Sequence, residues 1–530
     1  MKRAAGIVFR STLLIVIGIG IGVFISENNS TDQNFSFSLG HSDKISKVLR
    51  LVKDNYVDTV NADSLEGVAV NNLLQNLDPH SLYLQPERAQ SINESLDGSF
   101  VGVGLEYQLL RDTLVVTQVY PGGPSAAAGL AAGDKVIAVN QKKFSGTHLT
   151  TQRVDNALRG DTLSQVSLSV LLPDHKVKQY NIKRGHVDLG SIDAAYMATP
   201  GVGYIKISKF ALTTDGDFKT AFASLKSQGL KKLVLDLRGN GGGYLVAATS
   251  LADEFLAKDK LIVYTKGAHE ERRDYFATDS GVFKDGKLAV LIDEYSASAS
   301  EILAGALQDL DRAVIVGRRS FGKGLVQQQF PFGDGSAVNL TVARYYTPSG
   351  RSIQKSYKEG PDSYHNELAE RMRKGQLFSA QNNLNDSIFK TASPYHTSAG
   401  RKVFSGGGIM PDIFVPADSS ENTQIIQELG EQQLFTAYVV DHMEPLLNRY
   451  KSAGAFEQQY NVDDTEFDRF IVYASRTIRE MDSHDLLISK PVIKSLLKAS
   501  AARFKWGDDA YFEVMNDDDA AFNKAVAAVN

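Results

Sequence analysis

Ser298 and Lys323 are the two residues of this chain whose types and spacing best suit chemistry. Ser298 follows the apolar run 288–292 and precedes a helix-like segment, 301–310. Lys323 follows a second apolar run, 313–316. This order predicts two parallel strands joined by a helical crossover, whose carboxyl ends lie about 4.8 Å apart if the strands are neighbours. Open α/β sheets hold their active sites at that edge, so the pair suits a serine nucleophile with a lysine base.

A lysine acts as a base only when its amine is neutral, so burial must lower the pKa of Lys323 from about 10.4. In an extended segment, positions 323, 325 and 327 share a face. The amide of Gln327 can therefore hold the lysine amine without adding charge. Ser296 and Ser300 stay open as alternatives to Ser298, because serines at helix N-termini are common caps.

The acyl-transfer chemistry of such a pair also needs backbone donors for an oxyanion. The N–H of Ala299 is expected to be unpaired at the start of the helix, where the helix dipole favours negative charge. A second donor must come from another element. The segment Gly241–Gly243 is the candidate, because it follows the buried strand-like run 232–237 and glycines allow close backbone approach.

The N-terminus indicates export. Lys2, Arg3 and Arg10 precede an uncharged apolar run, 13–25, which is the pattern of a secretory signal. The run is short for a membrane span, which needs about 20 residues. Residues 1–26 are therefore interpreted as a cleaved signal peptide or a retained anchor, with both alternatives open. We predict a protein of the periplasm or cell envelope, anchored to the inner membrane if the segment is kept.

The whole chain has the composition of a folded, multidomain protein. It has 530 residues, of which 43% are hydrophobic and 22% charged, and a net charge of −5. That charge gives no global attraction to nucleic acid. The absence of cysteine excludes a cysteine nucleophile, a zinc–thiolate site and disulfides.

The pattern along the chain predicts a mixed α/β protein of several domains. The predicted parts after residue 26 are a helical region at 27–96, a β-rich domain at 97–185, an α/β core at 186–417 with a polar insertion at 364–400, and a helical region at 418–530.

Glycine turns between short strands mark the β-rich domain. The segment Val101-Gly102-Val103-Gly104, the run 121–130 and the strand-like run 133–140 occur in an order that resembles a PDZ domain. In that family the loop corresponding to Val101–Gly104 offers backbone N–H groups to a peptide's C-terminal carboxylate, and the peptide adds to the sheet as a strand. The alternative is a small β-rich domain whose glycine turns bind nothing.

Five motifs occur along the chain in order. They are Asp236-Leu-Arg-Gly-Asn-Gly-Gly-Gly243, Tyr295-Ser-Ala-Ser-Ala-Ser-Glu301, Phe321-Gly-Lys-Gly324 with Gln327, Tyr346-Thr-Pro-Ser-Gly-Arg-Ser-Ile-Gln354 and Gly407-Gly-Ile-Met-Pro-Asp412. With Asp78-Pro-His-Ser81 and the PDZ-like segment, they resemble the C-terminal processing peptidases, or tail-specific proteases, over about residues 42–417.

This resemblance implies a crotonase-like α/β core and a role for each site residue. Ser298 would be the nucleophile, Lys323 the general base and Gln327 the residue that supports the base. The oxyanion donors would be the N–H of Ala299 and those of the tri-glycine segment, Gly243 first and Gly242 beside it.

The function expected from the resemblance is a serine endopeptidase that forms an acyl-enzyme. Its substrates would be exported proteins recognised through their C-terminal tails, and no metal or organic cofactor would be needed. A homo-oligomer and an adaptor protein stay open as further partners. The alternative function is a non-catalytic PDZ adaptor with a degenerate protease core, which the intact Ser298, Lys323 and Gln327 disfavour.

One segment mimics a phosphate-binding loop. Residues 317–324 nearly match G-x-x-x-x-G-K-[ST], but Gly324 stands where a Mg²⁺-binding hydroxyl is required. A helix should also follow such a loop, whereas residues 325–330 read as a strand. The sequence therefore disfavours an NTPase.

Overall fold

The computed structural model describes residues 44–146, 149–172, 175–384, 394–418 and 423–530, in two units at 1–73 and 74–530. The described part of the first unit holds helix α2 (Lys44–Asn55) and most of α3 (Ala62–Gln75). Both helices lie in the region predicted to be helical, 27–96. The predicted signal or anchor, 1–26, lies outside the described residues. In the ranges given above, no helix combines the length and apolar character that a membrane crossing requires.

The α/β core is built on a six-stranded sheet that contains the strands predicted before Ser298 and Lys323. Its strands, in spatial order, are β10 (Ile192–Thr199), β11 (Val202–Ile207), β12 (Lys232–Asp236), β15 (Lys287–Ile292), β16 (Val314–Gly317) and β21 (Ile413–Phe414). Only the β10–β11 pair is antiparallel, and every other pair is parallel. Strands that are buried on both faces have continuous apolar sequences. The strands of this sheet could therefore be predicted from the sequence.

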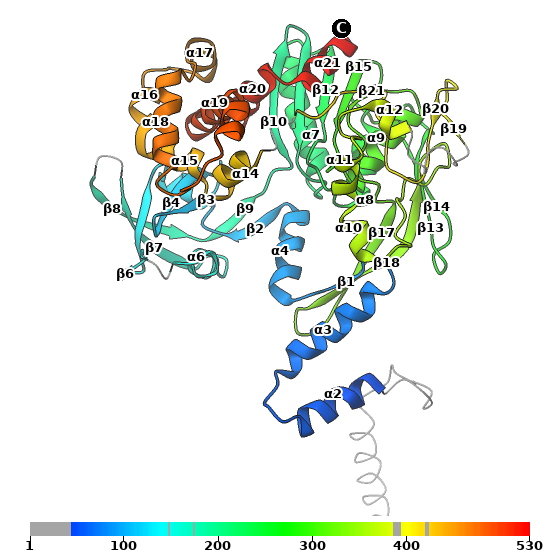
Figure 1. The fold of residues 1–530 in the computed structure, drawn as a ribbon, viewed down its shortest axis with the longest axis horizontal. Coiled ribbons are helices and arrows are strands. Elements are labelled where there is room, and N and C mark those ends of the chain that lie inside the picture. The colour runs from blue at the N-terminus through cyan, green and yellow to red at the C-terminus, as the bar shows by residue number, and fades with distance from the viewer. Residues whose placement is uncertain (1–43, 147–148, 173–174, 385–393, 419–422) are drawn as a thin grey trace, which may run out of the picture. The chain divides into compact units, whose positions relative to one another are not determined.

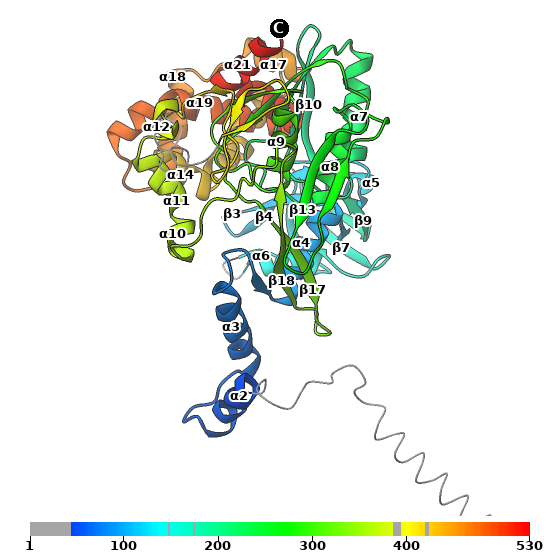
Figure 2. The same ribbon diagram turned by 90° about the vertical axis from the view of Figure 1, so that its right-hand side faces the viewer.

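Helices cover both faces of this sheet (Figures 1 and 2). One face packs against α7 (Thr214–Ser227), α8 (Leu245–Asp253) and α9 (Ala299–Asp309). The other face packs against α21 (Ala520–Val529) at the C-terminus. Successive side chains of a strand point to opposite faces, so Leu233 and Leu235 join the first layer while Val234 joins the second.

A second, five-stranded sheet is formed by strands that alternate along the sequence with those of the first sheet. It consists of β1 (Leu82–Leu84), β18 (Ala337–Tyr346), β13 (Leu261–Lys266), β14 (Arg273–Phe276) and β17 (Leu325–Pro331), which pairs with β18. Strand β1 comes from the region predicted to be helical, 27–96, and pairs with β18. Helix α4 (Pro86–Asp97) follows it.

The predicted PDZ-like segment forms its own antiparallel sheet. The chain enters and leaves it through the paired strands β2 (Ser99–Gly102) and β9 (Gly185–Asp188). The sheet has the order β3 (Leu105–Leu110), β4 (Thr113–Val119), β5 (Lys135–Val139), β7 (Gln165–Leu171) and β8 (Val177–Lys183), with β6 (Lys142–Lys143) paired to β5. Helices α5 (Pro124–Ala128) and α6 (Thr151–Leu158) complete it. Strand β3 is an edge strand that pairs only with β4.

The polar insertion is packed, not merely solvated. Its elements are α10 (Pro361–His365), α11 (Glu367–Arg373), α12 (Ala380–Leu384), β19 (Tyr395–His396) and β20 (Lys402–Val403). Tyr364 and Arg371 are only 2% and 3% exposed. Arg371 donates to the carbonyls of Arg319 and Ser320 in the loop that leads to Lys323. The packing of this insertion was not predicted, because several of its buried side chains are polar and it lacks apolar periodicity.

The C-terminal region is helical, as predicted. Its elements before α21 are α14 (Gln424–Glu431), α15 (Leu434–Tyr438), the π-helix η2 (Val439–Met443), α16 (Glu444–Leu447), α17 (Ala453–Gln459), α18 (Asp464–Ala474), α19 (Ser483–Trp506) and α20 (Asp508–Asp517). Helix α18 buries Phe467, Phe470 and Ala474 on one face. Asp519 of the acidic run 517–519 caps α21 and forms an ion pair with Arg238. It therefore has a structural role.

Candidate active site

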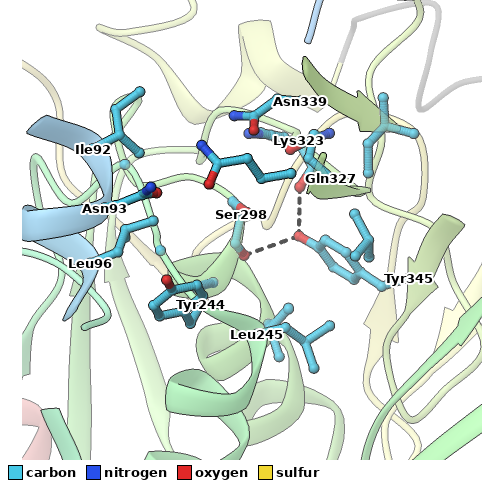
Figure 3. A pocket seen from close by; sticks show the side chains of 17 residues that line it. Ile92, Asn93, Leu96, Tyr244, Leu245, Ser298, Lys323, Gln327, Asn339 and Tyr345 are labelled. Atoms are coloured by element: carbon cyan, nitrogen blue, oxygen red, sulfur yellow. Dashed lines mark hydrogen bonds between the residues drawn. The ribbon is translucent and has the colours of Figure 1, made fainter. Parts of the chain in front are cut away.

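The topology brings the predicted serine and lysine to one edge of the six-stranded sheet. Strands β15 and β16 are parallel neighbours, with Ile292 opposite Gly317. The chain continues from β15 to Ser298 at the start of α9, and from β16 to Lys323 before β17. Both side chains line one cavity of about 300 Å³ (Figure 3). The strand–helix–strand arrangement expected from the sequence is therefore present.

Ser298 adopts a backbone conformation that is unusual for a residue with a side chain. Its φ is +56° and its ψ is −113°. Such a conformation costs about 1–3 kcal/mol and persists only where surrounding contacts enforce it. The backbone N–H of Ser298 donates to Oε2 of Glu301 at 2.9 Å. This bond is one of the contacts that hold the turn.

Glu301 ties the nucleophile segment to the base segment. Its Oε2 accepts from the backbone N–H of Ser298 and from that of Lys323, at 2.9 and 2.8 Å. Its Oε1 accepts from the hydroxyl of Ser320 and the N–H of Gly322, at 2.5 and 2.7 Å. Burial raises the pKa of Glu301 to about 7, against these four hydrogen bonds, which lower it. Four donors aimed at two oxygens suit the carboxylate, since a protonated acid would face one of them with its own hydrogen.

We expect Glu301→Gln to lower kcat about 100-fold, the usual effect of a misplacement near 1 Å. The glutamine amide must point its own hydrogens at two of the four donors, which pushes the segments of Ser298 and Lys323 apart. Kinetics on a peptide substrate would measure the loss. Glu294→Gln is the matched control, because Glu294 is buried at the same sheet edge but bonds to Arg318 instead. Equal kcat values for the two variants would contradict the bracing role.

Lys323 lies in an environment that disfavours its charge. Burial lowers the pKa of Lys323, and the negative charges of Glu301 and Asp78 partly offset this effect. The same neighbourhood lowers the pKa of His80 to about 3, through burial first and the charge of Lys323 second. Within the described ranges, no hydrogen bond joins Ser298 Oγ to Lys323 Nζ. The conformation therefore holds both groups at one cavity without a formed proton-transfer bond.

Gln327 lines the same cavity. Its Nε2 donates to Oγ1 of Thr341 at 3.2 Å, across the β17–β18 pair. No hydrogen bond between Gln327 and Lys323 is formed in the part of the chain that the structure describes. The support that Gln327 gives to the lysine stays a prediction.

The tri-glycine turn lies against the nucleophile. A Cβ on Gly242 would come within 2.8 Å of the Ser298 Cβ and 3.0 Å of the Ala299 nitrogen, and a Cβ on Gly243 would meet the carbonyl oxygen of Phe210 at 2.1 Å. The N–H of Gly242 already donates to Oδ1 of Asn240. This bond removes Gly242 from the expected oxyanion donors. Gly243 and Ala299 line the cavity, and their N–H groups have no partner among the described residues.

The walls of the cavity combine apolar and polar side chains. Leu245, Ile302 and Leu325 line it from the core, and Ile92 and Leu96 line it from α4. Figure 3 shows α4 on one side of Ser298 and Tyr345 on the other. The Tyr345 hydroxyl lies 3.1 Å from the carbonyl oxygen of Ser298 and 2.7 Å from that of Lys323. This hydroxyl is a second link between the segments of Ser298 and Lys323, beside that of Glu301.

The flanking serines have other partners. The Ser296 hydroxyl donates to the carbonyl of Leu237 at 2.8 Å, and the Ser300 hydroxyl donates to the carbonyl of Asn240 at 2.9 Å. Both residues are fully buried. These bonds leave Ser298 as the serine of the motif that lines the cavity.

The segment 317–324 leads into strand β17 and not into a helix, which agrees with rejecting a phosphate-binding loop.

The PDZ-like unit has a groove of about 380 Å³ at the edge strand. Val103 and Gly104 of the predicted carboxylate loop line it, with β3 on one side and Asp155 and Leu158 on the other. Val101 and Gly102 belong to β2, are paired with β9 and do not line the groove. The loop available to a carboxylate is therefore shorter than predicted.

Three structural residues of the site were missed in the sequence. Glu301 stands three residues after Ser298, the spacing of a capping box, so its contact with the Ser298 nitrogen was open to prediction. Tyr345 and Thr341 act through tertiary contacts, and no local pattern marks either of them.

Comparisons with known proteins match three parts of the chain. Residues 201–362 match peptidase family S41, residues 115–171 match a PDZ domain, and residues 425–507 match a family of unknown function.

Two curated relatives are each 35% identical. Carboxy-terminal processing protease CtpB of Bacillus subtilis (strain 168) aligns over 317 residues, 59% of this chain and 65% of the relative. The probable CtpA-like serine protease of Staphylococcus aureus (strain MRSA252) aligns over 352 residues, 66% of this chain and 68% of the relative. The chain thus spans about two thirds of their length. A solved structure, the photosystem II D1 C-terminal processing protease, is 31% identical, with a TM-score of 0.32 over 58% of this chain and 89% of that chain.

Proposed function

Because the chain belongs to peptidase family S41, the C-terminal processing serine proteases, we propose that it is a serine endopeptidase acting on proteins presented through their C-terminal tails. The observation that carries the proposal is the shared cavity. It holds a strained serine, a lysine whose pKa burial lowers, and two backbone N–H groups that bond to none of the described residues.

In the proposed reaction, the neutral amine of Lys323 takes the proton of Ser298 as its Oγ attacks the substrate carbonyl. The N–H groups of Ala299 and Gly243 stabilise the oxyanion. The lysine then donates its proton to the leaving amine, and water hydrolyses the acyl-enzyme. Proton transfer needs Lys323 Nζ within about 2.6–3.2 Å of the serine oxygen. Since that bond is not formed here, the proposed reaction requires the two groups to come closer when substrate binds.

The PDZ-like groove is the proposed site for the substrate tail. An extended peptide can pair with the free edge of β3, while the backbone at Val103 and Gly104 binds the terminal carboxylate. The predicted signal or anchor, residues 1–26, would place this activity in the periplasm or cell envelope.

An amidated substrate tests tail recognition. The test compares two substrate proteins that end in the same apolar tail, one with a free carboxylate and one with an amide. We expect KM to rise about 10- to 100-fold on amidation, since a hydrogen bond to a charged group contributes about 1.5–3 kcal/mol. Mass spectrometry would follow the fragments. Binding of both proteins without cleavage, unchanged by Ser298→Ala, would support the adaptor alternative instead.

A further inference from the structure

The turn 78–81, which carries no role in the proposed reaction, is anchored around one buried carboxylate. Asp78 is 7% exposed. Its Oδ1 accepts from the N–H groups of His80 and Ser81 and from Oγ1 of Thr341, at 2.8, 2.9 and 3.0 Å. Its Oδ2 accepts from the Ser81 hydroxyl at 2.6 Å. The Ser81 oxygen in turn accepts from the backbone N–H of Thr341 at 3.1 Å. The turn therefore holds both the main chain and the side chain of Thr341.

The hydrogen bonds of this network have a fixed direction. A carboxylate only accepts, so the single hydroxyl hydrogen of Thr341 is used on Asp78. The Thr341 oxygen can then only accept, and the amide of Gln327 meets it with Nε2. An amide whose NH₂ group is held in this way directs its carbonyl oxygen elsewhere. Gln327 lines the cavity that Lys323 also lines.

We propose that Asp78 and Thr341 are positioning residues, which fix the amide of Gln327 so that Oε1, and not Nε2, is presented to Lys323. This inference rests on the proposed function, because it assigns the orientation of the group that supports the base.

The chemistry of a neutral amine makes that orientation matter. Such an amine has two N–H donors and one lone pair. The carbonyl oxygen of Gln327 binds an N–H and leaves the lone pair free for the serine proton. A reversed amide would donate to the lone pair and compete with Ser298 for it. Asp78 and Thr341 are 263 positions apart in the sequence, so this contact depends on the tertiary fold and links the turn 78–81 to strand β18, which pairs with the strand of Gln327.

The test compares Thr341→Val with Thr341→Ser. Valine keeps the shape and removes the hydroxyl, whereas serine keeps the hydroxyl and so keeps the direction of the network. We expect kcat to fall about 100-fold in the valine variant, as for other losses of alignment, and to stay near wild type in the serine variant. KM should be similar in both variants, because Thr341 does not line the PDZ-like groove.

A second measurement does not depend on turnover. Titration of the Lys323 side-chain NMR signal, assigned by its loss in Lys323→Met, reports the pKa of the base directly. The charged and titratable groups that act on Lys323 are Glu301, Asp78 and His80, and both variants keep all three. A carbonyl acceptor stabilises the ammonium. The pKa of Lys323 should therefore be lower in the valine variant than in the serine variant.

The outcomes separate the two proposals. Equal kcat and equal Lys323 titration in both variants would overturn the positioning role. A loss of kcat in the valine variant without a change in titration would show a merely structural effect, and would also overturn it. If the wild-type protein cleaves no substrate and the Lys323 titration still differs between the two variants, the positioning role is supported and the peptidase assignment fails.

Discussion

Ser298→Ala is expected to reduce kcat on the order of 10⁶-fold, the loss that follows when a serine protease loses its nucleophile. No other described serine of the motif lines the cavity. The loss should appear in kcat while tail binding persists, because the groove at Val103 and Gly104 is built from a different sheet. Mass spectrometry of cleavage products would measure the rate. Labelling by a fluorophosphonate, mapped to a peptide, would identify the nucleophile.

Ser300→Ala is the matched control for that experiment. Its hydroxyl donates to the carbonyl of Asn240, so removing it should lower the free energy of unfolding by about 1 kcal/mol, the contribution of one hydrogen bond. The nucleophile, Ser298, is unchanged in this variant. The folded fraction should keep kcat near wild type and keep the label. Labelling that persists in Ser298→Ala and disappears in Ser300→Ala would contradict the assignment.

Much of the scaffold around this serine could be predicted from the sequence, because it depends on local patterns. Strand β15, helix α9 and strand β16 are each apolar or amphipathic over their whole length, and parallel crossovers have one favoured geometry. These rules are enough to bring Ser298 and Lys323 to one edge. The glycine run 241–243 was likewise predicted to approach the site, because few other sequences allow it.

The hydrogen bonds inside the site could not be predicted in the same way. The N–H of Gly242 is taken by Asn240, two residues earlier, and nothing in the glycine run shows which of its donors stays free. Strand β1 was missed because three residues carry too little periodicity to outweigh the helices before it. The sequence around Thr341 is that of an ordinary strand. Its place between Asp78 and Gln327 follows only from the tertiary fold.

Lys323→Met is expected to abolish turnover and to raise the stability of the protein. Methionine fills the same space with an unbranched chain but has no lone pair on nitrogen to take the serine proton. Burial lowers the pKa of Lys323, which means that folding disfavours the ammonium form of this side chain. Replacing the amine should raise the free energy of unfolding by about 0.5–2 kcal/mol, a typical gain where function opposes stability. Denaturant melts of the full chain would measure it.

The pH dependence of that gain identifies its source. The ordinary pKa of the lysine is 10.5, and its folded value is lower. Between these two values the unfolded chain binds a proton that the folded chain does not, so wild-type stability rises with pH. The gain in stability of Lys323→Met over wild type should therefore be full below the folded pKa of Lys323 and vanish near pH 10.5.

Lys323→Arg should also be inactive, since guanidinium stays protonated, and it should be less stable than wild type. An active arginine variant, or a methionine variant whose gain does not change with pH, would show that Lys323 is not the base.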